Sequence, residues 1–274
     1  MRVLVVDDQW IVESAVARAL APAGHVVVGV RSPEDLAARF AGDDRDFQLA
    51  FVDLDFQKES ERSGLAALEE CGKVGVPAAL LTADGEHNRI LHLLAAFEFY
   101  PDTLTLVSKN GAEKDIRDIA TAVAYGHRPN PEASADFRPP RRGPSWINSL
   151  VRQPGHLALW RAAAVCDRHA TIIEETRVGA RSLSTFLEQS AEAVQGLQQE
   201  FFGVASPEDE PGAGTRKKHL QVVTAFAQTY AWFFGDQDVE RLVNEMWGTE
   251  GRQEGQGRAA GVARRRKFRT GKRV

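Results

Sequence analysis

Three aspartates in the first half of the chain have the spacing of a site that could bind a cation and accept a phosphoryl group. Asp7 and Asp8 follow the apolar run 3–6, and Asp53 lies at the end of the run 49–54. Carboxylates that are held close together repel one another, and a divalent cation relieves this repulsion. Mg²⁺ prefers oxygen ligands, so we expect these side chains to hold it.

Two further residues suit the handling of a phosphoryl group. Thr82 closes the apolar run 78–82, and Lys109 follows the run 103–107. A lysine ammonium supplies a cation for phosphoryl oxygens, and a threonine hydroxyl can donate a hydrogen bond to them. With Mg²⁺ bound, Asp53 can act as the nucleophile toward phosphorus and form an aspartyl phosphate.

The elements that must position these residues alternate between strand and helix over residues 1–127. Expected strands occupy residues 3–6, 26–30, 49–54, 78–82 and 103–107, and expected helices occupy 11–20, 33–40, 65–71, 89–97 and 114–124. Strict alternation predicts a parallel sheet with helices on both faces. Ligands of such sheets bind beyond the carboxyl ends of the strands, where all five polar residues fall.

This constellation resembles the receiver domain of bacterial two-component response regulators. The resemblance covers residues 1–125 and implies a flavodoxin-like, doubly wound α/β fold with a five-stranded parallel sheet. It implies that Asp7 and Asp8 bind Mg²⁺ and that the backbone carbonyl of Asp55 completes the metal site. It also implies that Asp53 accepts a phosphoryl group from a sensor histidine kinase.

By the same resemblance, Thr82 and Lys109 contact the phosphoryl group, but two neighbouring positions depart from the family pattern. Asn110 follows the lysine where the family usually has a proline after a cis bond, and Leu106 stands where it has an aromatic residue. A cis bond before a residue other than proline costs about 3 kcal/mol, so we expect a trans or rearranged loop. Phosphate acceptance remains possible, and a receiver that works without phosphate is the alternative.

Composition divides the rest of the chain into three segments. Residues 128–144 contain five prolines and are predicted to form a semi-rigid or disordered linker. Helical periodicity then replaces the strand pattern, so residues 145–248 are predicted to be an all-α output domain. Residues 249–274 carry nine basic and two acidic residues and are predicted to be a basic tail that is disordered when free.

Residues 170–195 have the pattern of a helix–turn–helix, with a short helix, a turn that contains Gly179 and a longer helix. The segment loosely resembles the output domain of NarL/LuxR regulators. This resemblance implies that the second helix enters the major groove of DNA. The residues expected to contact DNA are Arg177, Arg181, Ser182, Ser184 and Thr185, together with Arg265, Arg266 and Lys267 of the tail.

An alternative for the helical half is a plain helical hairpin that docks on another protein. Residues 145–248 hold nine basic and 13 acidic residues, which counts against DNA binding. On this alternative the protein is an adaptor that is either gated by phosphorylation or independent of phosphate. The aromatic-rich stretches 220–234 and 239–247 predict a core or a dimer seam, and we expect a homodimer.

The remaining composition is typical of a soluble cytoplasmic protein that is not an enzyme. Cys71 and Cys166 lie far apart and have no metal-binding or redox spacing. The opening residues lack the apolar core of a signal peptide, and no apolar stretch approaches a membrane span. The helical half shows no nucleophile–base set. The sequence therefore predicts a response regulator that is phosphorylated on Asp53 and controls transcription through DNA.

Overall fold

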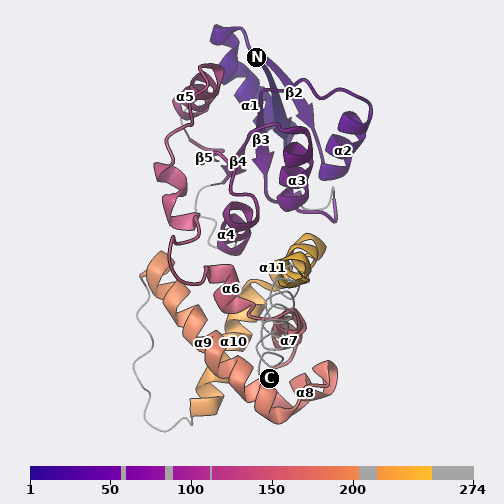
Figure 1. Cartoon of the computed structure of the whole chain (residues 1–274), viewed down its shortest axis with the longest axis vertical. Coiled ribbons are helices and arrows are strands. Elements are labelled where there is room, and N and C mark those ends of the chain that lie inside the picture. Colours follow the sequence, from indigo (N-terminus) through magenta and orange to yellow (C-terminus); the bar gives the residue numbers. More distant parts are fainter. Residues whose placement is uncertain (57–59, 84–88, 112, 204–214, 249–274) are drawn as a thin grey trace, which may run out of the picture.

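The computed structural model describes the chain except for residues 57–59, 84–88, 112, 204–214 and 249–274. An α/β half that carries the N-terminus lies above a helical half in Figure 1. The predicted basic tail lies outside the described residues. Among the helices that are described, none is long and apolar enough to cross a membrane.

The N-terminal half is built on a five-stranded parallel sheet, as predicted. Its strands are β1 (Arg2–Val6), β2 (Val26–Val30), β3 (Leu49–Asp53), β4 (Ala78–Thr82) and β5 (Leu106–Ser108). The strand order is β2-β1-β3-β4-β5, and every neighbouring pair is parallel. This is the order of a doubly wound, flavodoxin-like sheet, so the predicted receiver fold is confirmed.

Helices cover both faces of the sheet. One face carries α1 (Trp10–Leu20) and α5 (Glu113–Ala124), and the other carries α2 (Pro33–Ala41), α3 (Gly64–Val74) and α4 (Ile90–Phe99). Successive side chains of a strand point to opposite faces. Val3 and Val5 of β1 therefore pack in the first layer, whereas Leu4 and Val6 pack in the second.

The last strand differs from the prediction, which placed it at residues 103–107. β5 begins at Leu106. The carbonyl groups of Thr103 and Leu104 accept hydrogen bonds from the guanidinium of Arg138, which lies in the proline-rich segment after α5. The predicted strand therefore started too early, although the N–H of Leu104 and the carbonyl of Thr105 still form hydrogen bonds with Ala78 and Leu80 of β4.

The proline-rich segment 128–144 packs on the α/β half. It contains the 3₁₀ helix η3 (Glu132–Phe137), which contacts both β5 and α4. The hydroxyl of Thr105 donates a hydrogen bond to the carbonyl of Asn130 at 3.1 Å. These contacts fix the path of the chain from α5 toward the helical half.

The C-terminal half contains helices and loops, and no strand, among its described residues, as an all-α domain requires. Its helices are α6 (Trp146–Leu150), α7 (Gly155–Val165), α8 (His169–Thr176), α9 (Ala180–Phe202), α10 (Thr215–Thr229) and α11 (Ala231–Gly235), followed by a helix over residues 237–248. Helix α10 packs against both α7 and α9. The aromatic-rich stretch predicted at 220–234 is divided between α10 and α11.

Trp160 of α7 lies at the centre of the helical half. Its side chain is fully buried and stacks on Phe234, with ring centroids 4.6 Å apart. The edge of Phe186 lies against it at 5.3 Å, and its indole N–H donates to the carbonyl of Leu150 at 2.9 Å. The stretch 220–234, for which a core or a dimer seam was expected, contributes Phe226, Tyr230, Phe233 and Phe234 to this core, whereas its Trp232 is 43% exposed.

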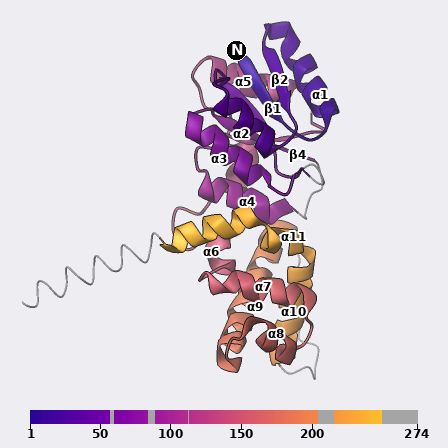
Figure 2. The same ribbon diagram turned by 90° about the vertical axis from the view of Figure 1, so that its right-hand side faces the viewer.

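The two halves share one apolar core, which includes buried side chains of α4, α6 and α11. Figure 2 shows helix 237–248 running beneath α4. Three polar pairs join this part of the chain to the α/β half: His92 with Asp236, Arg62 with Asp238, and Glu69 with Arg241. The helical half is thus docked on the face of the sheet that carries α3 and α4.

Candidate functional site

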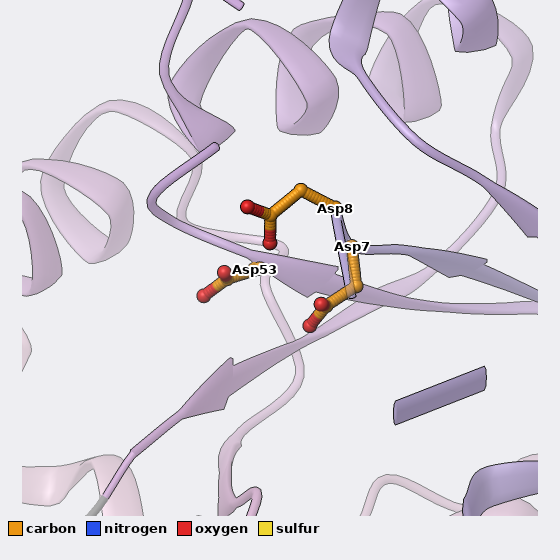
Figure 3. A group of neighbouring side chains, drawn as sticks. All are labelled: Asp7, Asp8 and Asp53. Carbon is orange, nitrogen blue, oxygen red and sulfur yellow. The ribbon is translucent and has the colours of Figure 1, made fainter. Parts of the chain in front are cut away.

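The five side chains with predicted roles in phosphoryl chemistry come from the carboxyl ends of four strands, which meet at one edge of the sheet. Asp7 and Asp8 follow β1, and Asp53 is the last residue of β3. Thr82 ends β4, and Lys109 directly follows β5. Figure 3 shows the carboxyl groups of the three aspartates gathered around a common space.

Lys109 joins two of the aspartates. Its Nζ lies 2.7 Å from Oδ2 of Asp53 and 2.9 Å from Oδ2 of Asp7. Both carboxylates are buried, so water screens these charges little. Burial alone would lower the pKa of Lys109, but the two carboxylates outweigh burial and raise it. The ammonium therefore stays charged beside the predicted phosphoryl acceptor.

Asp53 is under opposing influences. Burial raises the pKa of its carboxyl group, the charges of Lys109 and Arg89 lower it, and the charge of Asp7 raises it again, with a resulting pKa of about 6. The backbone N–H of Leu54 donates to Oδ1 at 2.8 Å. Asp53 is therefore mostly ionised at neutral pH while it remains shielded from water, as an attacking carboxylate requires.

The three aspartates fit a hard divalent cation. One oxygen atom from each of Asp7, Asp8 and Asp53 lies within 4.8 Å of the others. Oδ1 of Asp8 is buried and accepts no hydrogen bond from any described residue. Burial, and then the charge of Asp7, raises the pKa of Asp8. A buried carboxylate oxygen without a partner is costly, and a cation such as Mg²⁺ would supply the partner.

Arg89 is a member of the site that the sequence analysis missed. It directly precedes α4, and its side chain is 16% exposed. Its Nη2 lies 2.6 Å from Oδ2 of Asp55, and its Nη1 lies 3.5 Å from Oδ1 of Asp53. The side chain of Asp55 therefore pairs with an arginine, whereas only its backbone carbonyl was predicted to act. No motif marks Arg89, because its role depends on where α4 begins in space.

The strand ends around Thr82 and Lys109 are held together by the backbone. The N–H of Lys109 donates to the carbonyl of Thr82 at 2.6 Å, and the hydroxyl of Thr82 donates to the carbonyl of Ala83 at 3.3 Å. No described residue follows a cis peptide bond, so the bond before Asn110 is trans, one of the two expected outcomes. Leu106 is partly buried in β5.

Gly64 lets the loop after Asp53 return close to β3. It is the first residue of α3, and its N–H donates to the carbonyl of Leu54 at 3.0 Å. A Cβ at this position would overlap the carbonyl oxygen of Asp53 and lie 2.6 Å from Cα of Leu54. Only glycine permits such an approach of two backbones, so this residue helps to fix the site.

The helix–turn–helix predicted at 170–195 is present as α8, a short turn and α9. Arg177 begins the turn in the left-handed region with φ of 56°, and Gly179 caps α9. Of the residues predicted to contact DNA, Arg177, Arg181, Ser182 and Thr185 are exposed, and Ser184 is partly buried. Arg265, Arg266 and Lys267 lie outside the described residues.

The exposed side of α8 and α9 is more acidic than basic. Its exposed basic residues include Arg177, in the turn between the helices, and Arg181, in the first turn of α9. Its exposed acidic residues are Glu174, Glu175, Glu188, Glu192 and Glu200. Proteins that bind DNA normally present a basic face to it. Within α8 and α9, the exposed basic residues predicted to contact DNA therefore lie only in the connecting turn and at the start of α9.

No protein-family model matches the chain, and no curated protein matches it. Solved structures of response regulators are similar in fold. The RcsB response regulator of Salmonella typhimurium, in a structure described as showing conformational dynamism for DNA interaction, is 19% identical, with 81% of this chain and 99% of that chain covered and a TM-score of 0.49. RcsB from Salmonella enterica serovar Typhimurium bound to a promoter is 16% identical, with 74% and 99% covered and a TM-score of 0.43.

The receiver domain of NtrX from Brucella abortus is also similar to this chain. It is 25% identical, with 45% of this chain and 98% of that chain covered and a TM-score of 0.38. The isolated receiver domain thus covers under half of this chain, whereas the two RcsB structures cover about three quarters or more of it. These are similarities of fold.

Proposed function

We propose that this protein is a two-component response regulator and that Asp53 accepts a phosphoryl group from a sensor histidine kinase. The observation that supports the proposal is a buried carboxylate with a pKa of about 6 that contacts Lys109 and shares a cation-sized space with Asp7 and Asp8. An ordinary aspartate at the end of a strand is exposed and forms hydrogen bonds with water, so it needs neither a buried lysine nor two neighbouring carboxylates.

Asp53 and the residues around it have separate roles in phosphoryl transfer. A carboxylate oxygen attacks phosphorus as the bond from phosphorus to the leaving group breaks. Lys109 places its ammonium where negative charge accumulates on the transferred group, and Thr82 supplies a hydroxyl as a further donor. Mg²⁺ bound by Asp7, Asp8 and the carbonyl of Asp55 would neutralise charge between the carboxylates and the phosphoryl oxygens.

Incubation with Mg²⁺ and acetyl phosphate tests this proposal. We expect the intact mass of the native protein to rise by one phosphoryl group, and we expect no gain in Asp53→Asn or when the metal is chelated. Asp102→Asn is the matched control, since that side chain is 97% exposed and precedes the amino end of β5, whereas the site lies at the carboxyl ends of the strands. An unmodified native protein would favour the alternative of a receiver that works without phosphate.

For the output, we infer that the helical half binds DNA through the start of α9 and the basic tail. Arg181 and Thr185 are exposed on the first turns of the predicted recognition helix. The tail residues Arg265, Arg266 and Lys267 would add contacts to phosphates that weaken as salt rises. On this proposal the protein is a cytoplasmic homodimer that regulates transcription.

A mobility shift on genomic fragments at low salt tests the DNA proposal. Arg181→Ala is expected to weaken binding by roughly 1–3 kcal/mol if it contacts a base edge. Arg152→Ala, an exposed arginine outside α8 and α9, is the matched control and should bind as the native protein does. The acidic exposed side of α9 favours the second candidate, an adaptor whose helical half docks on another protein, and the absence of any shift would select it.

A further inference from the structure

Arg89 occupies a place that connects the candidate phosphorylation site to the helical half. The two terminal nitrogens of its guanidinium contact different carboxylates. Nη2 lies 2.6 Å from Oδ2 of Asp55, and Nη1 lies 3.5 Å from Oδ1 of Asp53. The shorter contact is to the residue that has no predicted side-chain role. The longer contact is to the predicted phosphoryl acceptor.

We propose that Arg89 is a positioning residue that exchanges Asp55 for the phosphoryl group when Asp53 is modified, and that it carries the start of α4 with it. This inference rests on the proposed phosphorylation of Asp53. The planar fork of an arginine matches the oxygens of a phosphoryl group and can donate two parallel hydrogen bonds to them. A phosphoryl group also carries more negative charge than the carboxylate with which Arg89 is paired in this structure.

The position of Arg89 makes such a movement consequential. It is the residue that directly precedes α4, so a shift of its backbone acts on the first turn of that helix. The same turn carries His92, three residues later, and residues at this spacing lie on one side of a helix. A contact made by Arg89 is therefore transmitted over a single helical turn.

His92 is the point at which α4 meets the helical half. It is fully buried, and its Nε2 lies 3.0 Å from Oδ2 of Asp236. Its ring stacks on Trp232 at 3.9 Å and meets the edge of Phe233 at 5.0 Å. A close-packed interior does not deform continuously but changes from one packing arrangement to another. A displaced His92 must therefore change its contacts with α11.

This route would replace the switch that the receiver resemblance leads one to expect. Leu106 stands where an aromatic side chain is usual, and a leucine cannot donate a hydrogen bond. Helix α4 is the element that would switch instead. Arg89 before its first turn contacts two carboxylates, and His92, three residues later, packs against the helical half. Most residues of α4 are buried, and the helix packs against α6 and η3. A movement of α4 would therefore act on these neighbours as well.

Fluorine NMR on protein labelled with 5-fluorotryptophan measures this coupling. The chain has five tryptophans, and a Trp232→Phe variant identifies the resonance of Trp232. We expect this resonance to shift when acetyl phosphate and Mg²⁺ modify the native protein. The shift should be lost in Arg89→Gln and at least partly restored in Arg89→Lys. Arg18→Gln, which removes an exposed ion pair with Glu113, should respond as the native protein does.

Intact mass on the same samples separates the possible failures. A native protein that gains no phosphoryl group refutes the proposed function and this inference with it. A fully modified Arg89→Gln protein in which Trp232 still shifts refutes the inference alone, as does a modified native protein in which Trp232 does not shift. Failure of Arg89→Gln to gain phosphate while Arg89→Lys gains it would support contact with the phosphoryl group.

A second variant decides the question if Arg89→Gln does not fold. Asp55→Asn removes the charge that competes for Arg89 and leaves the arginine in place. We expect the full shift of Trp232 on modification of this variant, because the guanidinium has lost its resting partner and not its new one. A modified Asp55→Asn protein without the shift would overturn the proposal.

Discussion

Replacement of Lys109 by glutamine is expected to slow phosphoryl acceptance by Asp53 roughly 10²–10³-fold, the usual loss when one preorganised donor is removed from a reacting oxygen. The ammonium contacts both Asp53 and Asp7, and glutamine retains a hydrogen-bond donor but no charge. Intact mass against time, with acetyl phosphate and Mg²⁺, gives the rate. Lys73→Gln is the matched control, because Lys73 is 55% exposed on α3 and pairs with Glu69 and Glu70, away from the three aspartates.

The same variant should change the pH dependence of the reaction. Burial raises the pKa of Asp53, and Lys109 is the largest influence that lowers it toward about 6. Removal of the ammonium therefore raises the pKa further, so less of the carboxylate is available at neutral pH. The variant should recover part of its rate as the pH rises, and its rate should begin to fall at a higher pH than the native rate does, with Mg²⁺ present in both reactions. A native rate in Lys109→Gln at every pH would contradict the assigned role.

Replacement of Trp160 by alanine is expected to lower the free energy of unfolding by about 3–5 kcal/mol, the range for truncation of a large buried aromatic residue. The side chain is 0% exposed and loses its stacking on Phe234 and its hydrogen bond to Leu150. Denaturant unfolding followed by circular dichroism measures the loss.

Trp10→Ala is the matched control for that substitution. Trp10 is 69% exposed at the start of α1, so its truncation should change the free energy of unfolding by less than about 0.5 kcal/mol. A Trp160→Ala protein as stable as this control would mean that α7 does not form the centre of the helical half.

The positions of the strands and helices were predictable because they depend on local periodicity. Residues 26–30 and 78–82 were predicted as strands and form strands with these bounds, and the helix predicted over residues 11–20 spans Trp10–Leu20. Convergence of the five site residues followed from one rule, since the carboxyl ends of parallel strands share one edge of a sheet.

The parts that the sequence did not reveal depend on contacts between distant segments. Arg89 has no periodic signal, and its partner Asp55 lies 34 residues away. His92 and Asp236 are separated by 144 residues, and nothing in either local sequence indicates the other. The hydrogen bonds from Arg138 to the carbonyls of Thr103 and Leu104 likewise join segments that lie 35 and 34 residues apart.

Helix 237–248 contacts residues that adjoin the candidate site. Asp238 accepts hydrogen bonds from the side chain of Arg62 and from the backbone N–H of Ser63, the residue that caps α3. The next residue is Gly64, whose backbone lies against Asp53. The α/β half therefore contacts the C-terminal helices through both α3 and α4.

Trapping of the modified residue tests the central claim most directly. An aspartyl phosphate is an acyl phosphate, which borohydride reduces to homoserine, so peptide mass spectrometry after reduction identifies the residue that carried the phosphoryl group. With acetyl phosphate and Mg²⁺, we predict homoserine at position 53 and at no other aspartate. Homoserine at another position, or a native protein that yields none, would contradict the assignment of Asp53 as the phosphoryl acceptor.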